Sequence, residues 1–161
     1  YPVAVTDREG EGVLYSTPEL ADGRANLFQP GTDQTGRQPV PTVTLDSWRR
    51  REHQVLPDFI KMDVEGAEAA ALRGAQETLA ASEPLLLVEM KEAIFQSLGL
   101  ERTAIQDFLR PLGYRPAGLA RGRWRLFDDV REIASRNVWW LKPQLPRHRH
   151  KAGRVRLEGL T

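Results

Sequence analysis

Cysteine is absent from this sequence of 161 residues. Its absence excludes disulfide bonds, thiolate metal sites and a cysteine nucleophile, while it leaves the redox compartment open. No apolar run approaches the length of a membrane span, and the N-terminus lacks the charged and then apolar pattern of a signal peptide. A formal net charge of only +1 gives no case for nucleic acid from global charge. We therefore expect a cytoplasmic protein with no membrane partner.

The overall composition is that of one globular domain. The chain is long enough to bury a core, and its 40% hydrophobic and 28% charged residues are ordinary values. There is no starting Met, and Pro2 to Val5 reads like the middle of a strand, so we expect the sequence to be the C-terminal part of a longer chain. Residues from 146 on are basic and carry almost nothing apolar, which predicts a domain over 1–145 and a disordered tail over 146–161.

The stretch from Phe59 to Glu68 carries the strongest structural signal. It begins as a short apolar run, ends in acids and Gly66, and passes at once into an alanine-rich helical pattern. This order predicts a buried strand feeding a helix, and ligands gather at the carboxyl ends of such strands. The helix is expected to present one apolar face, with four-residue spacing from Ala67 to Leu79.

A second continuous apolar run extends from Pro84 to Met90 and also ends in an acid, Glu89. Continuous rather than alternating apolar character is typical of a parallel strand that is covered on both faces. Two strands joined by a helix should be parallel, with a right-handed crossover. If the two strands are neighbours, Asp63 and Glu89 lie side by side at the same end of the sheet.

The remaining segments complete an α/β pattern. Residues Ser16 to Pro41 are rich in Gly, Pro, Thr and Gln and predict a long loop. Asp46 is expected to cap a short helix through His53, and Gly74 is tolerable inside the longer helix if close packing needs it. The other expected elements are strands near 3–5 and 13–15, a helix opened by a capping box at 103–106, a hairpin over 114–127 and a last strand over 137–141.

Three carboxylates, those of Asp63, Glu65 and Glu68, fall within six residues at the end of the first run. Carboxylates are costly to desolvate, so such a cluster needs solvent or a partner such as a cation or a ligand donor. Structural roles stay open for each of them. Asp63 could pair with Lys61, which shares its strand face. Glu65 and Glu68 could suit the first helical turn, where negative charge is favourable.

Two further alternatives concern the acid at the end of the second run. Glu89 could simply cap a turn. Asp63, Glu65 and Glu89 could also offer oxygens to Mg²⁺, although no fixed ligand spacing demands a metal. None of the three histidines is expected to act as a base, because they lie at a polar helix end and in the tail: His53, His148 and His150.

Four pieces of the sequence, taken together in order and spacing, resemble the FkbM-type methyltransferases, a family that uses S-adenosylmethionine. They are Thr44–Ser47, Phe59–Glu68, Leu72–Ala75 and Pro84–Glu89. The Lys-Met-Asp-Val-Glu-Gly-Ala-Glu core of the second piece is quite specific, whereas the other pieces are weak alone. The resemblance runs from about Val3 to Pro143 and covers only the later part of the family's domain.

The resemblance implies an α/β fold with a Rossmann-type sheet whose last strand is antiparallel. Val3–Thr6 is similar to the family's third strand, Phe59–Val64 to its fourth and Leu85–Glu89 to its fifth. Nothing in the sequence matches the glycine-rich loop after the family's first strand or the acid that ends its second, so these two strands are expected to be absent. Phe59–Val64 would then have an open edge, and Val3–Thr6 would have no native neighbour.

The resemblance also implies S-adenosylmethionine-dependent methyl transfer to a hydroxyl group of a small molecule or glycan. Asp63 is then expected to contact either the ammonium end of the cofactor or the acceptor, and Val5 is the other expected cofactor contact. Glu65 and Glu89 become candidates for a general base or for acceptor binding. The resemblance implies no metal. Because the glycine-rich loop is missing, we expect this chain alone to bind the cofactor poorly.

Two other functions compete with this reading. The chain could be a non-catalytic fragment or a partner-binding half-domain, whose open sheet edge is covered by another chain. It could also bind nucleic acid through the basic residues from Arg147 to Arg156. Aromatic interleaving is absent there and two of the basic groups are histidines, which disfavours nucleic acid as a partner.

Overall fold

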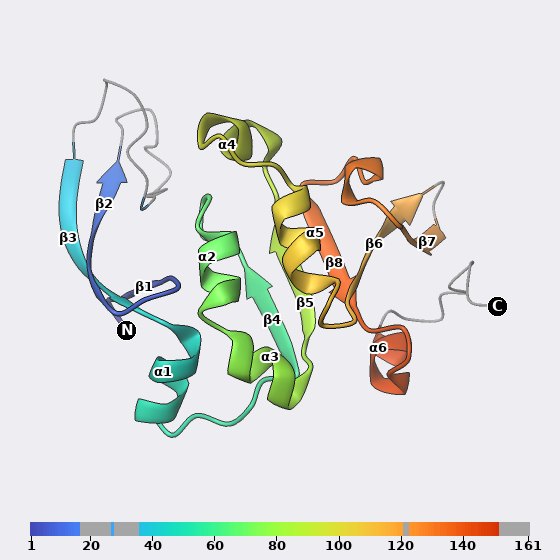
Figure 1. Cartoon of the computed structure of the whole chain (residues 1–161), viewed down its shortest axis with the longest axis horizontal. Coiled ribbons are helices and arrows are strands. Elements are labelled where there is room, and N and C mark those ends of the chain that lie inside the picture. The colour runs from blue at the N-terminus through green and yellow to red at the C-terminus, as the bar shows by residue number, and fades with distance from the viewer. Residues whose placement is uncertain (17–26, 28–35, 121–122, 152–161) are drawn as a thin grey trace.

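The computed structural model describes residues 1–16, 27, 36–120 and 123–151, which form two β-sheets and the helices packed on them (Figure 1). The small sheet has the order β1-β3-β2, and the larger sheet has the order β4-β5-β8-β6-β7. The strands are β1 (Ala4–Val5), β2 (Gly10–Ser16), β3 (Gly36–Val43), β4 (Phe59–Met62), β5 (Leu85–Glu89), β6 (Arg115–Ala120), β7 (Arg123–Leu126) and β8 (Asn137–Leu141). The predicted α/β class, with a Rossmann-like sheet, is confirmed.

The helices of the described residues are short. They are α1 (Leu45–Arg51), α2 (Glu68–Arg73), α3 (Gln76–Ser82), α4 (Glu92–Ser97), α5 (Thr103–Leu109), a 3-10 turn (Val130–Glu132) and α6 (Pro146–Lys151). Figure 1 shows α2, α3 and α5 over one face of the larger sheet, with the small sheet beyond α2. None of the helices in this part of the chain is long and apolar enough to cross a membrane.

The two apolar runs form the adjacent parallel strands β4 and β5, with Met62 opposite Val88. β8 runs antiparallel to both of its neighbours, β5 and β6, as predicted for the last strand. β4 lies at the edge of the larger sheet among the strands that the structure describes, as expected from the resemblance. The carboxyl ends of β4 and β5 therefore meet at one rim of the sheet.

The main core lies between this sheet and its helices. Leu86 and Val88 of β5 and Val138 and Trp140 of β8 are fully buried there, because alternate residues of a strand face the same side. They pack against the apolar side chains of α2, α3 and α5, among them Leu72, Leu79, Ile105 and Leu109. Fully burying a single leucine of this kind is worth roughly 1.5–3 kcal/mol. The core thus fixes β4 and β5 relative to the helices that follow them.

The small sheet corrects two expectations. The segment 16–41 is not a loop throughout, because β3 begins at Gly36 and pairs antiparallel with β2. β3 contains Pro39 and Pro41, and proline has no backbone N–H to donate. Because they are two residues apart, the backbone nitrogens of both can point away from β2, where no donor is needed. The expectation that the first strand has no native neighbour is also wrong, since β1 pairs in parallel with Thr42 and Val43 of β3. The rest of the expected loop, 17–26 and 28–35, lies outside the described residues.

The single helix expected after β4 is two helices, α2 and α3, which separate at Gly74 and Ala75. A Cβ atom on Gly74 would lie 2.1 Å from the carbonyl oxygen of Thr6. The backbone that follows β1 therefore packs directly on this glycine. Close packing at Gly74 is the condition under which we expected a glycine to be tolerated in this helix. The same contact holds the small sheet against the helices.

The helix cap expected at Asp46 is wrong. Thr44 caps α1 instead, and its hydroxyl oxygen accepts a hydrogen bond from the backbone N–H of Ser47 at 3.0 Å. Asp46 lies within the helix, where its buried carboxylate accepts from the backbone N–H groups of Glu77 and Thr78 at the start of α3. Asp46 therefore caps a different helix, and α1 ends at Arg51 rather than at His53.

The capping box expected at 103–106 is also absent. The N-cap position of α5 is Arg102, which makes no side-chain cap hydrogen bond. The side-chain oxygen of Gln106 accepts instead from the backbone N–H of Val130, at 2.7 Å. The side chain of Gln106 therefore binds a buried backbone N–H of a distant turn instead of capping its own helix.

The C-terminal elements follow the sequence more closely. β6 and β7 form the expected hairpin, and β8 is the expected last strand. The segment expected to be a tail begins with helix α6, and residues 152–161 lie outside the described part. His148 of α6 is buried, and the side chain of Arg147 donates to the carbonyl oxygen of Ser82. Both basic side chains therefore make hydrogen bonds within the molecule.

Candidate active site

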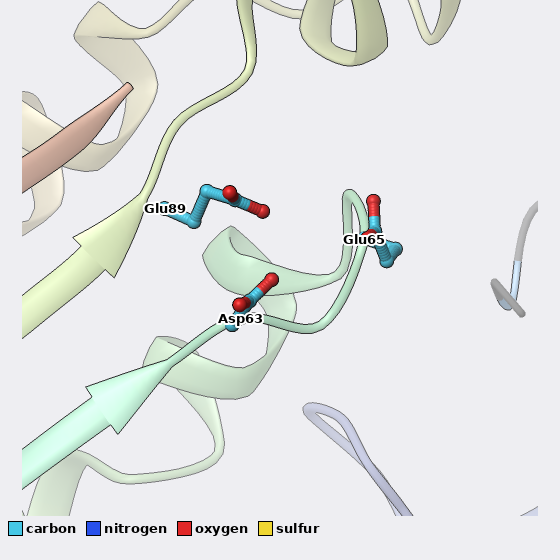
Figure 2. A group of neighbouring side chains, drawn as sticks. All are labelled: Asp63, Glu65 and Glu89. Carbon is cyan, nitrogen blue, oxygen red and sulfur yellow. The ribbon is translucent and has the colours of Figure 1, made fainter. Parts of the chain in front are cut away.

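The rim at the ends of β4 and β5 carries three acidic side chains (Figure 2). Asp63 follows β4 directly, Glu89 is the last residue of β5, and Glu65 lies in the turn that leads from β4 to α2. One carboxylate oxygen from each lies within 4.8 Å of the others. The predicted neighbourhood of Asp63 and Glu89 is therefore confirmed. Asp63, Glu65 and Glu89 are called the acidic cluster below.

The turn between β4 and α2 has a strained backbone that Glu68 supports. Glu65 and Gly66 both adopt positive φ angles, 50° and 103°. The buried carboxylate of Glu68 accepts from the backbone N–H groups of Val64 and Gly66 at 3.1 and 3.0 Å. Burial raises the pKa of Glu68, although these backbone donors oppose the rise. Glu68 therefore has the structural role that the sequence left open, and it fixes where Glu65 points.

Basic side chains partner every member of the acidic cluster. Lys61 contacts Asp63 at 2.9 Å, which is the pairing considered from the sequence. Lys91 places its Nζ 2.8 and 2.9 Å from the two Glu65 oxygens and 2.8 Å from Glu89. Arg136 approaches Glu89 at 3.5 Å. The acids of the cluster are therefore held in an ion-pair network rather than by solvent alone.

Lys91 and Arg136 were not among the residues singled out from the sequence. Lys91 follows Glu89 by two residues, at the start of α4, so its position after the strand was the available signal. Arg136 precedes β8, and its carbonyl oxygen accepts from the backbone N–H of Met90. Nothing in the local sequence connects it with Glu89, because the contact depends on β8 pairing with β5.

The network shifts two ionisation equilibria in opposite directions. Hydrogen bonds from Lys61 and then from Glu89 hold the pKa of Asp63 below its usual range. Burial opposes the charge of Lys91, yet the hydrogen bonds to Glu65 and Glu89 outweigh it and raise the pKa of the ammonium group. The network therefore favours the charged forms of Asp63 and Lys91.

Two cavities flank the turn after β4. The smaller, about 270 Å³, is lined by Asp63 and by apolar side chains, among them Val5, Leu14 and Val64. Val5 and Asp63, the two residues expected to contact a cofactor, thus lie on one cavity. The larger, about 460 Å³, lies between the small sheet and α2, with Gly66, the neighbour of Glu65, in its wall. Open space therefore lies on both sides of the turn that carries Glu65, and only the larger cavity has the volume of a whole small-molecule site.

The larger cavity has a polar rim and an apolar wall. Asp7 and Arg73 form an ion pair at its edge, with the Arg73 Nε and Nη2 atoms 3.2 and 3.0 Å from one Asp7 oxygen. Small apolar residues of α2, Ala69 and Ala70, and Leu98 after α4 supply the wall. Such a mixture suits a molecule with both hydrocarbon and hydroxyl surface.

Neither of the two histidines whose side chains the structure describes takes part in this site, as the sequence predicts. His53 is exposed just after α1, with a positive φ of 49°. His148 is buried at the opposite end of the fold from the acidic cluster, between Lys142 and Glu83 near the start of β5. The side chain of His150 lies outside what the structure describes.

An α/β domain with acids gathered at the carboxyl ends of adjacent parallel strands has the arrangement of an enzyme of the Rossmann-like class. The chain belongs to the methyltransferase FkbM domain family, whose family model matches residues 1–116. No curated protein matches the sequence.

Among solved structures, the chain is similar to the crystal structure of methyltransferase FkbM from Methylobacillus flagellatus KT, with 16% sequence identity and a TM-score of 0.44. The match covers 87% of this chain and 27% of that chain. The chain therefore spans about a quarter of the length of that protein.

Proposed function

We propose that the domain takes part in S-adenosylmethionine-dependent methyl transfer to a hydroxyl group, with the acidic cluster at the acceptor. Membership of the FkbM family supports methyl transfer. The observation that carries the proposal is the meeting of Asp63, Glu65 and Glu89 at the ends of β4 and β5, where Asp63 lines the smaller cavity. Convergent acids beside a cavity are the usual setting for proton transfer to or from a bound substrate.

The residues around the smaller cavity fit part of the cofactor. Val5, Leu14 and Val64 offer an apolar surface to a flat ring or a methylene chain, and Asp63 offers a charge-stabilised carboxylate to an ammonium or hydroxyl group. A volume of about 270 Å³ is below the range of roughly 300–1,000 Å³ that whole ligands of this size occupy. When bound, S-adenosylmethionine supplies a methyl group that leaves its sulfur as the acceptor oxygen bonds to the carbon, the electron pair staying on sulfur.

The chain's own part in the reaction is to hold the acceptor hydroxyl and to take its proton. The Asp63–Glu89 pair is the group best placed to receive that proton, because one oxygen of each acid lies within 4.8 Å of the other and Asp63 lines the smaller cavity. A general base at this position contributes about 10²–10⁴-fold, and correct positioning contributes more. Glu65 has both oxygens on Lys91, which favours a role in orienting the site over proton transfer.

The larger cavity provides room for the acceptor. Its rim holds both donors and acceptors of hydrogen bonds, Arg73 and Asp7, and its wall is apolar. Its wall includes Gly66, the residue that follows Glu65 of the acidic cluster. An acceptor that lies in this cavity with one hydroxyl over the turn would bring that oxygen toward the Asp63–Glu89 pair.

The test follows transfer of tritium from S-adenosyl-[methyl-³H]methionine to a panel of neutral hydroxyl acceptors, such as oligosaccharides and glycosides, by the protein in its full natural length. Glu89→Gln keeps the size of the side chain and removes the base. We expect it to lower kcat by about 10²–10⁴-fold. Asp63→Asn is expected to raise KM for the cofactor or acceptor as well, since Asp63 lines the smaller cavity.

Asp128→Asn is the matched control. Asp128 is an exposed acid in an ion pair with Arg115, and it follows β7, which lies at the opposite edge of the larger sheet from β4. Its variant should retain full activity. Methyl transfer that is absent with every hydroxyl acceptor, or a Glu89→Gln variant as active as the native protein, would sink the proposal.

A second candidate, association with a partner chain, is favoured by the edge position of β4. Phe59 of β4 keeps 43% of its surface exposed and stacks on Trp139 of β8. An open strand can accept another strand, although a charged residue such as Lys61 discourages such pairing. Light scattering on a sizing column separates the two cases: a defined dimer or complex that Phe59→Lys dissociates supports partner binding, and a monomer contradicts it.

A further inference from the structure

Lys91 holds a central position in the acidic cluster. Its Nζ atom lies 2.8 and 2.9 Å from the two oxygens of Glu65 and 2.8 Å from Oε2 of Glu89. Only 20% of the lysine side chain, 16% of the Glu65 side chain and 7% of the Glu89 side chain are exposed. One ammonium group therefore bridges two carboxylates in a largely water-free setting, where ion pairs are stronger than at the surface.

The charges around the cluster balance without any added ion. Three carboxylates, if all are ionised, are matched by three basic groups that face them from different elements: Lys61 of β4, Lys91 at the start of α4 and Arg136 before β8. Lys61 contacts Asp63 at the exposed side, with 53% of its side chain accessible. Lys91 is the member of this set that joins two of the acids.

The span of the cluster is nevertheless that of a cation site. One oxygen from each acid lies within 4.8 Å of the others. Calcium–oxygen distances of about 2.3–2.6 Å place oxygens on opposite sides of an ion at roughly that separation. The carboxylates are thus close enough to share a divalent cation, and the position between Glu65 and Glu89 is where Lys91 has its ammonium group.

The covalent link gives the lysine an advantage over a dissolved ion. Lys91 is two residues from Glu89 along the chain, so its ammonium group reaches the cluster without loss of translational freedom. A group held by so short a connection competes at an effective concentration of about millimolar or more. A dissolved divalent cation would also have to lose part of its water shell, which Mg²⁺ in particular does reluctantly.

We propose that Lys91 is the resident cation of the acidic cluster: it holds Glu65 and Glu89 together and occupies the position that a divalent metal ion would otherwise take. The cluster therefore works as a metal-independent site, and replacing Lys91 by an uncharged residue turns it into a binding site for a divalent cation. This inference concerns the charge design of the cluster and goes beyond the proposed methyl transfer.

The test is a calorimetric titration of residues 1–161 with Mn²⁺, free of cofactor and acceptor. The native chain should show no saturable binding tighter than about 1 mM. Lys91→Ala should bind Mn²⁺ about tenfold or more tightly than the native chain, because three carboxylates lose a positive neighbour. Lys91→Arg keeps the charge and should behave like the native chain.

Lys61→Ala is the matched control, since it removes a lysine that contacts one acid only and should create no bridging site. Lys91→Met, which keeps the length of the side chain, replaces Lys91→Ala if circular dichroism shows that the alanine variant has lost its fold. Saturable binding of Mn²⁺ to the native chain with a dissociation constant below about 1 mM, or equal affinities of the native, alanine and methionine forms, would overturn the proposal. Because no methyl transfer enters the measurement, its outcome is separate from that of the proposed function.

Discussion

Asp46 and Thr78 are joined by two hydrogen bonds across 32 residues of sequence: Oδ1 of Asp46 accepts from the backbone N–H of Thr78 at 2.8 Å and from its hydroxyl at 2.6 Å. The second oxygen accepts from the backbone N–H of Glu77 at 2.9 Å. This buried carboxylate thus caps α3 from within α1. One side chain therefore ties α1, which precedes β4, to α3, which precedes β5.

Replacing this carboxylate should destabilise the fold. Asp46→Ala leaves buried donors of α3 without an acceptor, and hydrogen bonds to charged groups are worth about 1.5–3 kcal/mol. We expect a loss of about 2–3 kcal/mol in the free energy of unfolding, measured with urea. The exposed acid Asp128, changed to Ala, should cost about 0–1 kcal/mol. Equal losses for the two variants would contradict the capping role.

The sign of the stability change on Gly74→Ala tests whether the backbone of Thr6 packs on Gly74. Helix propensity alone favours alanine over glycine by up to about 1 kcal/mol. The added Cβ atom would lie 2.1 Å from the backbone oxygen of Thr6, however, and backbone cannot move aside cheaply. We expect a destabilisation of about 1–3 kcal/mol, as for other overpacked sites. A thermal melt in which the variant is more stable than the native chain would show that Thr6 does not pack here.

The stability of the C-terminal region should depend on His148. Its Nδ1 accepts from the backbone N–H of Lys142 at 2.9 Å, so the imidazole is neutral, and its other ring nitrogen then donates to the carbonyl oxygen of Glu83 at 2.8 Å. Burial lowers the pKa of His148, and the charges of Arg147 and Lys142 add to the effect while Glu83 opposes it. The ring of Tyr114 packs beside it.

A lowered pKa in the folded state means that the unfolded chain takes up the proton first as the pH falls. His148 therefore contributes its full stability above its ordinary pKa of about 6.5, and that contribution is lost below it. Urea unfolding at pH 8 and pH 5 should show the loss, at no more than about 1.4 kcal/mol per pH unit. His148→Ala should weaken this dependence, while His53→Asn at an exposed site should leave it intact. A His148→Ala variant with the native pH dependence would refute the assignment.

Binding of S-adenosylmethionine by residues 1–161 alone should be weak. The cavity at Val5 and Asp63 holds about 270 Å³, less than the whole cofactor needs. Calorimetry is expected to give a dissociation constant weaker than about 1 mM, equivalent to less than about 4 kcal/mol of binding free energy. Asp63→Asn should not change so weak an interaction measurably. Micromolar affinity of the native chain would contradict this expectation.

The sequence predicts the rim of the larger sheet well because that rim depends on local signals. The runs ending at Met62 and Glu89 are apolar, of strand length and joined by a helix, so a parallel pair is the expected outcome. Their ends are level in the sheet, which brings Asp63 and Glu89 together. Strand type and order were enough to place these two acids.

What the sequence does not predict depends on partners far along the chain. Asp46 and Gln106 satisfy donors 31 and 24 residues away rather than those of their own helices. β3 contains Pro39 and Pro41, whose loop character is offset by pairing with β2. Arg136 reaches Glu89 only because β8 lies beside β5. In each case a local pattern is overridden by tertiary packing, which no short window of sequence contains.

The cavity beside Asp63 takes its walls from two different sheets, with Val5 on one side and Val64 next to the other. A molecule seated there would act as a non-covalent staple between them. Its binding would then stabilise the N-terminal strands as well as the central sheet. Protection of residues 1–16 against proteolysis would therefore report occupancy of the cavity at Asp63, which lies far from those residues in sequence.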